Sequence, residues 1–130
     1  METATFYVGD LCYVLTDSEW DIVCAGDFDG ENYLDPEGYD IMVEKSGRPY
    51  SIFRTEYGDG WYSDKEGRGY AVDSGSIGCI AVSNISESAL LQSALDRGLG
   101  QLHELDAYTV ESATCESGVM YFDTVIIETA

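Results

Sequence analysis

Two aspartates, Asp59 and Asp73, are the residues of this chain best placed for chemistry, because each ends a strand-like run at a glycine-containing turn. Carboxylate oxygens are the ligands that hard divalent cations prefer, so Asp59 and Asp73, joined by Asp10 or Asp64, could hold such an ion. The structural alternative gives Asp59 a plain turn position and lets Asp73 accept amide hydrogen bonds from the turn that follows. The sequence leaves both interpretations open.

Asp73 also belongs to a short run, Val72-Asp-Ser-Gly-Ser76, that invites two hydrolase interpretations. Ser74 could act as a nucleophile only if His103, the single histidine, supplied the base. The run also resembles the catalytic turn of the aspartic proteases, which implies that Asp73 would share a proton with a symmetry mate from a second chain. A carboxylate-based hydrolase is therefore the enzymatic alternative for this chain.

The other patterns that carry chemistry are missing from the sequence. There is no H-E-x-x-H, no Cys/His zinc set and no phosphate-binding loop, so we expect no cofactor and favour a protein that is not an enzyme. Four cysteines occur without C-x-x-C spacing, which is typical of reduced thiols in the cytoplasm. No run approaches the roughly twenty apolar residues of a membrane span, so we predict no membrane contact.

Charge is the unusual property of the chain. Six Lys and Arg stand against 25 Asp and Glu, which gives a formal net charge of −19. Nucleic acids and membrane surfaces are anionic and would repel such a protein. We therefore expect it to bind neither of them directly. Two interpretations remain: a well-solvated acidic surface, as in adaptation to high salt, or an acidic decoy that enters the groove of a basic partner protein.

One acidic segment, residues 27–38, is bounded by glycine and proline and could present several carboxylates together. It does not fit an EF-hand loop, because Pro36 stands where the bidentate glutamate is required. We therefore predict that this segment contacts the basic partner, which is a nucleic-acid-binding protein if the carboxylates imitate phosphates. The predicted partner-binding residues are Asp27, Asp29, Glu31, Asp35 and Glu37.

Several short motifs occur in a fixed order between Phe6 and Val82. They are Tyr7-Val-Gly-Asp10, Tyr57-Gly-Asp-Gly60, Gly67, Tyr70, Val72-Asp-Ser-Gly75 and Ile77-Gly78. This ordered set resembles the signature of a family of small, largely uncharacterised acidic proteins of bacteria and their phages. The resemblance implies a compact, strand-rich cytoplasmic domain that is phage-related, and it supplies no catalytic residues.

These residues must be positioned by a folded core. At 130 residues the chain is long enough to bury one, so we predict a single domain over residues 1–130. Strand-like runs outnumber helical ones, and we predict an α+β fold: an antiparallel sheet or small open barrel of about six to eight strands, with two short helices on one side. The helices are expected near Ser18 to Cys24, after a capping box at Thr16, and near Ser86 to Arg97.

The strands between Tyr50 and Val82 are expected to form a meander, with a tight hairpin turn at Gly58-Asp-Gly60. Residues 5–15 read as two short strands or one bulged strand. Leu99 to Asp106 has no clear pattern and is interpreted as a linker that leaves His103 at the surface. The chain is expected to close with a hairpin whose second strand, Val119 to Glu128, is central because both of its faces are apolar.

Overall fold

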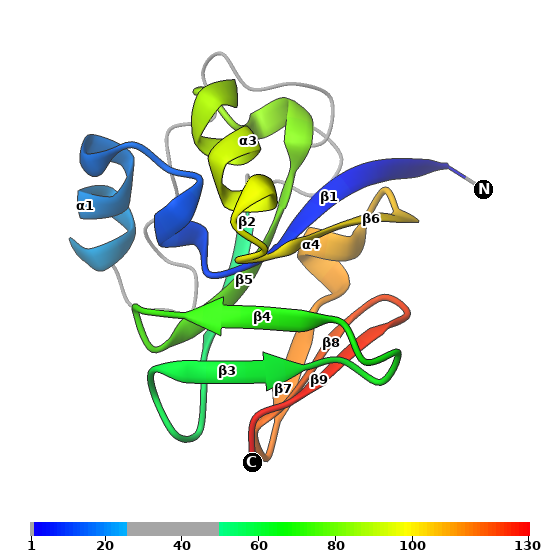
Figure 1. Cartoon of the computed structure of the whole chain (residues 1–130). Helices are drawn as coiled ribbons and strands as arrows, with labels where there is room; N and C mark the ends of the chain where they lie inside the picture. Colours follow the sequence, from blue (N-terminus) through cyan, green and yellow to red (C-terminus); the bar gives the residue numbers. More distant parts are fainter. Residues whose placement is uncertain (1, 26–49) are drawn as a thin grey trace.

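A computed structural model describes residues 2–25 and 50–130, and its centre is a four-stranded antiparallel sheet (Figure 1). The strand order is β2-β5-β1-β6, and β5 therefore lies between two neighbours. Ile80 of β5 lies opposite Tyr7 on one side and Tyr50 on the other. The bounds are β1 (Thr3–Gly9), β2 (Tyr50–Arg54), β5 (Ser76–Ala81) and β6 (Gln101–Asp106).

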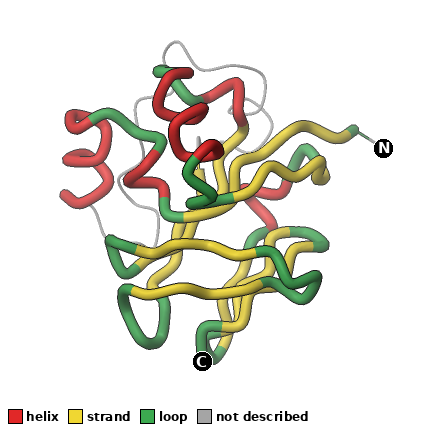
Figure 2. Tube along the Cα trace, in the orientation of Figure 1, coloured by secondary structure: helices red, strands yellow, loops and turns green. Residues whose placement is uncertain are grey.

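Two smaller antiparallel sheets accompany the main sheet (Figure 2). One is the hairpin of β3 (Gly60–Ser63) and β4 (Gly69–Val72). The other has three strands in chain order: β7 (Thr114–Glu116), β8 (Val119–Phe122) and β9 (Val125–Glu128). A single bridge between Asp64 and Ile127 joins the hairpin to β9.

Short helices connect the strands in the described part of the chain. They are α1 (Asp17–Ala25), α3 (Ser88–Asp96) and α4 (Thr109–Ser112), with single 3-10 turns η1 (Leu11–Tyr13) and η2 (Val82–Asn84). The capping box is present, because the Glu19 amide donates to Thr16 Oγ1 at 3.2 Å and the Thr16 amide donates to Glu19 Oε1 at 2.8 Å. These two bonds satisfy amides that the first turn of α1 would otherwise leave open.

The central part of the main sheet, which consists of β5 and the second half of β1, is buried on both faces. Phe6 and Val8 of β1 point into one apolar cluster, which they share with Phe122 of the three-stranded sheet. Tyr7, between them, points into the second cluster with Val23 of α1. Side chains alternate along a strand, so a sheet covered on both sides needs apolar residues at consecutive positions. This requirement explains why every residue of β5 is buried.

The predicted class agrees with the structure in its coarse form, since short helices accompany antiparallel sheets. The sheets are open rather than closed into a barrel, and the described residues contain nine strands instead of six to eight. Residues 26–49 lie outside the described part of the chain.

The predicted meander is wrong in its order. β2 pairs with β5, and the β3–β4 hairpin forms a separate excursion between them. Gly58 does adopt the left-handed conformation expected of a turn, with φ of 74°, but the turn leads from one sheet into another. The reason is that β5 is apolar on both faces. A position in the core, with a paired strand along each edge, is therefore more favourable for β5 than a position at the edge of a sheet.

Three further expectations are corrected. Residues 101–106 are not a linker but the edge strand β6, which pairs with β1 along its whole length. Asp123, with φ of 55°, turns the chain between β8 and β9, so the stretch expected as one strand is two. After β1, the chain forms η1 rather than a second strand, because the Asp10 side chain accepts the Cys12 amide and caps the turn.

Gly78 offers a test of the β2–β5 contact. A Cβ at this position would lie 2.5 Å from the Ser51 carbonyl oxygen and 2.7 Å from Leu11 Cδ1. We expect Gly78→Ala to lower the free energy of unfolding by about 1–3 kcal/mol, because the backbone of β2 must move. Urea denaturation measures the change. Ser63→Ala, at an exposed strand position, is the control and should stay within about 0.5 kcal/mol. Equal stability of Gly78→Ala and the wild type would contradict the packing.

Candidate functional site

Asp10 is a fully buried carboxylate at the end of β1. Its Oδ1 accepts the Cys12 amide at 3.0 Å and the Ser74 hydroxyl at 2.8 Å, and its Oδ2 accepts the amides of Asp73 at 2.8 Å and Ser74 at 2.7 Å. The Ser74 hydroxyl gives its one proton to Asp10, so Ser76 must donate the bond of 2.7 Å that joins the two serines. Asp10 therefore fastens the β4–β5 turn to the end of β1.

Asp59 and Asp73 are exposed and approach the same place. Burial, together with the hydrogen bond and charge of Asp10, raises the pKa of the Cys12 thiol, and the charges of Asp73 and Asp59 raise it further. Asp59 also lies beside the β4–β5 turn, because a Cβ on Gly75 would come within 3.8 Å of its Oδ1. Asp73 begins this turn, so the two predicted aspartates lie at the same end of the hairpin.

These aspartates do not form a ready metal site within the described ranges. No group of three or more His, Cys, Asp or Glu in residues 2–25 and 50–130 is arranged to hold a metal ion. Both oxygens of Asp10, the third carboxylate nearby, already accept hydrogen bonds from protein groups. A metal ion at Asp59 and Asp73 remains a prediction.

Ser74 and His103, the pair that a serine hydrolase would require, have different partners. The Ser74 hydroxyl bonds to Asp10 and Ser76, as described above. His103 Nε2 lies 2.9 Å from the hydroxyl of Tyr70. Within the described part of the chain, no hydrogen bond joins Ser74 to His103. Asp73, at the turn that resembles the aspartic proteases, is exposed, and its amide donates to Asp10.

Asp64 is the second buried carboxylate, at the far end of the β3–β4 hairpin. Its Oδ1 accepts the amides of Glu66 at 2.9 Å and Arg68 at 3.0 Å, and its Oδ2 accepts Arg68 Nε at 3.2 Å and the Tyr70 hydroxyl at 2.6 Å. Because Tyr70 gives its proton to Asp64, neutral His103 must donate from Nε2 to the Tyr70 oxygen. The bonds run from His103 through Tyr70 to Asp64.

This network sets the ionisation of its members. Burial alone raises the pKa of the Asp64 carboxyl, but the hydrogen bonds from Tyr70 and the Arg68 amide and the Arg68 charge outweigh it, so the pKa lies below its usual value. Burial, and then the bond to Asp64, raises the pKa of Tyr70. Burial and the charge of Arg68 lower the pKa of His103, while Asp64 opposes them. His103 is therefore held in its neutral form.

The position of His103 corrects the expectation of a surface residue. It is 7% exposed, on β6, and it stacks beside Tyr70 with ring centroids 6.5 Å apart. The alternation of apolar and polar residues did not indicate that His103 is buried, because the apolar Leu102 points outward and the polar His103 points inward. Its partner Tyr70, on β4, is 33 residues away in the sequence, so no local pattern of residues predicts this contact.

An exposed tryptophan lies between the two buried carboxylates. Trp61 on β3 is 63% exposed, and its indole covers Gly69 of the neighbouring strand, in the space that a Cβ on Gly69 would occupy. Tyr62 points the other way, toward the first apolar cluster, and its hydroxyl donates to the Gly58 carbonyl at 2.8 Å. We call the indole of Trp61 and the Gly69 backbone beneath it the Trp61 platform. Sequence reasoning missed it, although a Trp and a Gly on the two strands of one hairpin are its signal.

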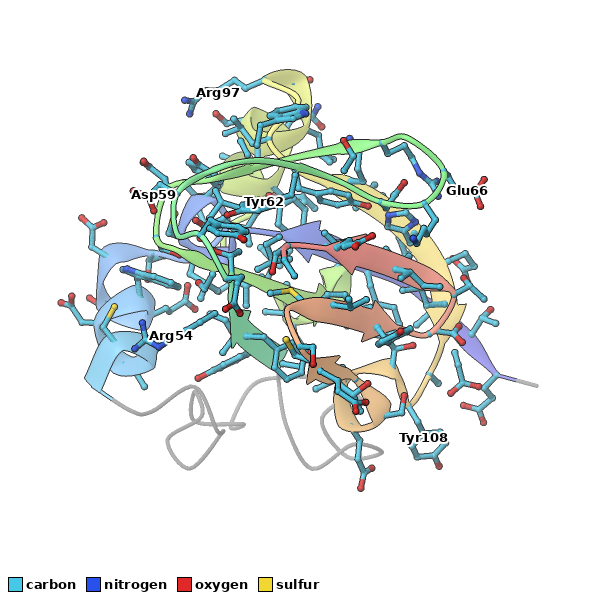
Figure 3. All side chains as sticks on the ribbon, turned by 90° about the horizontal axis from the view of Figure 1, so that it is seen from below. Arg54, Asp59, Tyr62, Glu66, Arg97 and Tyr108 are labelled. Carbon is cyan, nitrogen blue, oxygen red and sulfur yellow. The ribbon has the colours of Figure 1, made fainter. Side chains whose placement is uncertain are left out.

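The two ends of the hairpin differ in character. Figure 3 labels Asp59 at one end and Glu66 at the other. The Glu66 end borders an open, polar hollow of about 410 Å³ that is lined by Glu66, Arg68 and Thr124. Lys65 at this end pairs with Glu128 at 3.4 Å. The Asp59 end carries the exposed carboxylates of Asp59 and Asp73 and is acidic.

The predicted partner-binding residues cannot be placed by the structure. They belong to residues 26–49, outside the described part of the chain: Asp27, Asp29, Glu31, Asp35 and Glu37. Comparison with protein-family models, with curated proteins and with solved structures finds no match to this chain. Among the helices in residues 2–25 and 50–130, none combines the length and apolar character needed to cross a bilayer.

Two fully buried tyrosines, Tyr70 and Tyr7, give a matched test of the Asp64 network. Tyr70 makes two hydrogen bonds through its hydroxyl, whereas the buried hydroxyl of Tyr7 has no hydrogen-bond partner within the described residues. We expect Tyr70→Phe to lower the free energy of unfolding by about 1–3 kcal/mol, because Asp64 and His103 each lose a buried partner. Tyr7→Phe should be neutral or slightly stabilising. Similar losses in urea denaturation for both variants would contradict the network.

His103 predicts a pH dependence of stability. Its pKa in the folded protein lies below the unfolded value of 6.5, so the unfolded chain takes up the proton first as pH falls. The contribution of neutral His103 is present above pH 6.5 and is lost as pH falls through the folded pKa. In His103→Gln, whose amide can still donate to Tyr70, the free energy of unfolding should fall less between about pH 7 and pH 5. Identical slopes would show that His103 titrates normally.

Proposed function

We propose that this protein is a small acidic interaction protein that binds a basic partner protein. The observation that carries the proposal is the formal net charge of −19 on a folded chain of 130 residues. Such a charge creates a negative field that attracts and orients a basic surface before contact.

The few positive charges hardly weaken this field. Of the six Lys and Arg, four lie in the described ranges. Arg68 pairs with the buried Asp64 at 3.2 Å and Lys65 pairs with Glu128 at 3.4 Å, so both are partly neutralised within the protein. Arg97 is exposed and projects from the end of α3 (Figure 3). The outer surface therefore remains predominantly acidic.

Only some of the carboxylates make hydrogen bonds that hold the fold together. Asp10 and Asp64 each accept four hydrogen bonds inside the protein. Many other carboxylates are exposed, and five of them have no hydrogen bond or ion pair within the described residues: Asp17, Asp21, Glu87, Glu111 and Glu116. Repulsion among exposed carboxylates does not stabilise the fold. Their number therefore supports a role in binding another molecule.

We infer that the partner is a cytoplasmic nucleic-acid-binding protein, bound in the groove that otherwise holds phosphates. The acidic segment of residues 27–38 supports this from the sequence, because glycine and proline bound a run that is rich in carboxylates. The resemblance to small acidic phage proteins supports a partner in host defence or in nucleic-acid metabolism. In this proposal the carboxylates of Asp27, Asp29, Glu31, Asp35 and Glu37 make the contact.

The test is a pull-down from bacterial lysate at two salt concentrations. A basic nucleic-acid-binding protein should be retained at about 50 mM salt and lost above about 0.5 M, because screening then acts within a few ångströms. Duplex DNA should displace it. Neutralising the five carboxylates of the acidic segment to Asn or Gln should slow association several-fold, as measured by surface plasmon resonance.

The control neutralises five carboxylates elsewhere and has the same net charge. It changes Asp17, Asp21, Glu87, Glu111 and Glu116 to Asn or Gln. If the acidic segment makes the contact, this control should lose less affinity than the segment variant. If both variants bind alike, the contact is not in the segment. If no basic protein is retained at low salt, the acidic surface is only solvated and the proposal fails.

A further inference from the structure

The β3–β4 hairpin is fixed at both ends by buried carboxylates. At one end, Asp10 accepts the amides of Asp73 and Ser74 at 2.8 and 2.7 Å. At the other end, Asp64 accepts two amides and the hydroxyl of Tyr70. A surface held in this way loses little conformational freedom when it binds, and that makes it suited to recognition.

Trp61 is displayed on the outer face of this hairpin. Its indole lies against Gly69, where any side chain would displace it, so the ring is held across the hairpin rather than free in solvent. Even so, 63% of the residue is exposed. Large aromatic side chains are usually buried, and exposed Trp is enriched at the energetic centres of protein interfaces. The Trp61 platform therefore has the properties of a contact surface.

Acidic side chains lie at one end of the hairpin that carries the platform. Trp61 lies opposite Ala71 in the register of the hairpin, and Asp73 directly follows the last residue of β4, two positions after Ala71. Asp73 is exposed, whereas Val72 between them is buried. Asp59 precedes β3 at the same end (Figure 3). An indole face next to two carboxylates attracts a cation by two different mechanisms.

No cation of the described residues occupies the indole face. Arg68 and Lys65 are paired with Asp64 and Glu128 at the far end of the hairpin. Arg97 acts on Tyr13, whose pKa is raised by burial and by Asp73 and is lowered by Arg97. The ring contacts within residues 2–25 and 50–130 join Phe53 to Phe122 and Tyr70 to His103, and neither includes Trp61. The platform thus has room for a cation from another molecule.

We propose that the Trp61 platform binds an arginine from an extended basic segment of the partner, with its guanidinium stacked on the indole and a second basic side chain at Asp59 and Asp73. This inference rests on the proposed function and names the chemistry that the partner must present. A planar guanidinium fits a flat ring better than a lysine ammonium does. Alternate residues of an extended segment point to the same side about 7 Å apart, which suits two adjacent subsites.

The probe is an eight-residue peptide of alternating arginine and glycine. Matched peptides replace arginine by lysine, or by citrulline, which keeps the shape without the charge. Trp20→Phe leaves Trp61 as the only tryptophan, so its fluorescence reports on the platform directly. We expect saturable quenching or a spectral shift with the arginine peptide, weaker binding with lysine, and no response with citrulline at the same concentrations.

Variants separate stacking from charge. Trp61→Ala should weaken binding of the arginine peptide by roughly 2- to 30-fold in calorimetry, which is the range of cation–π contacts. Gly69→Ala keeps the indole but moves it, so it should also weaken binding. Asp59→Asn and Asp73→Asn should each weaken binding measurably, whereas Arg97→Gln should strengthen it. Glu111→Gln, which removes one exposed charge on α4, is the control for net charge.

The outcomes distinguish this inference from the proposed function. Circular dichroism and melting temperature first establish that each variant is folded, and the same variants are then used in the lysate pull-down. If basic ligands bind but Trp61→Ala and Gly69→Ala bind them as well as the wild type, the platform is wrong and the proposed function stands. If neither the peptide nor any basic protein is bound at low salt, both fail.

Discussion

The buried carboxylate of Asp10 is the interaction on which much of this structure depends. It joins the end of β1, at the centre of the main sheet, to the turn that leads from the hairpin into β5. A buried carboxylate is costly unless its oxygens are satisfied, and here four donors satisfy them. The same bonds define the path of the chain through Ser74, in the turn that connects the hairpin to β5.

Asp64 plays the corresponding role at the opposite end of the hairpin, and the two carboxylates differ in what they contact. Asp10 binds mainly backbone amides of a turn, whereas Asp64 continues through Tyr70 to the only histidine. Between them lies the hairpin, whose inner residue Tyr62 packs toward the core while Trp61 faces solvent. Two buried carboxylates thus hold the two ends of the hairpin, while most of the other carboxylates in the described residues lie at the surface.

Sequence reasoning succeeded where the signal was local. The capping box at Thr16 and Glu19 involves residues three positions apart, and both of its hydrogen bonds are present. Strands between Tyr50 and Val82 were also expected, but the pairing of β2 with β5 was not. A metal ion held jointly by Asp59 and Asp73 stays a prediction, but Asp59 does lie beside the turn that follows β4. Such proximity depends on Asp10, which is 63 residues from Asp73.

By itself, the sequence determined the strand-rich composition, the class of fold, the start of α1 and the acidic charge, because these follow from residue types and short spacings. Tertiary structure decided that β2 pairs with β5, that His103 is buried against Tyr70, and that Trp61 lies across Gly69. Each of these contacts joins segments that are distant along the chain. Their stability depends on which apolar faces are covered together, and no local pattern of residues contains that information.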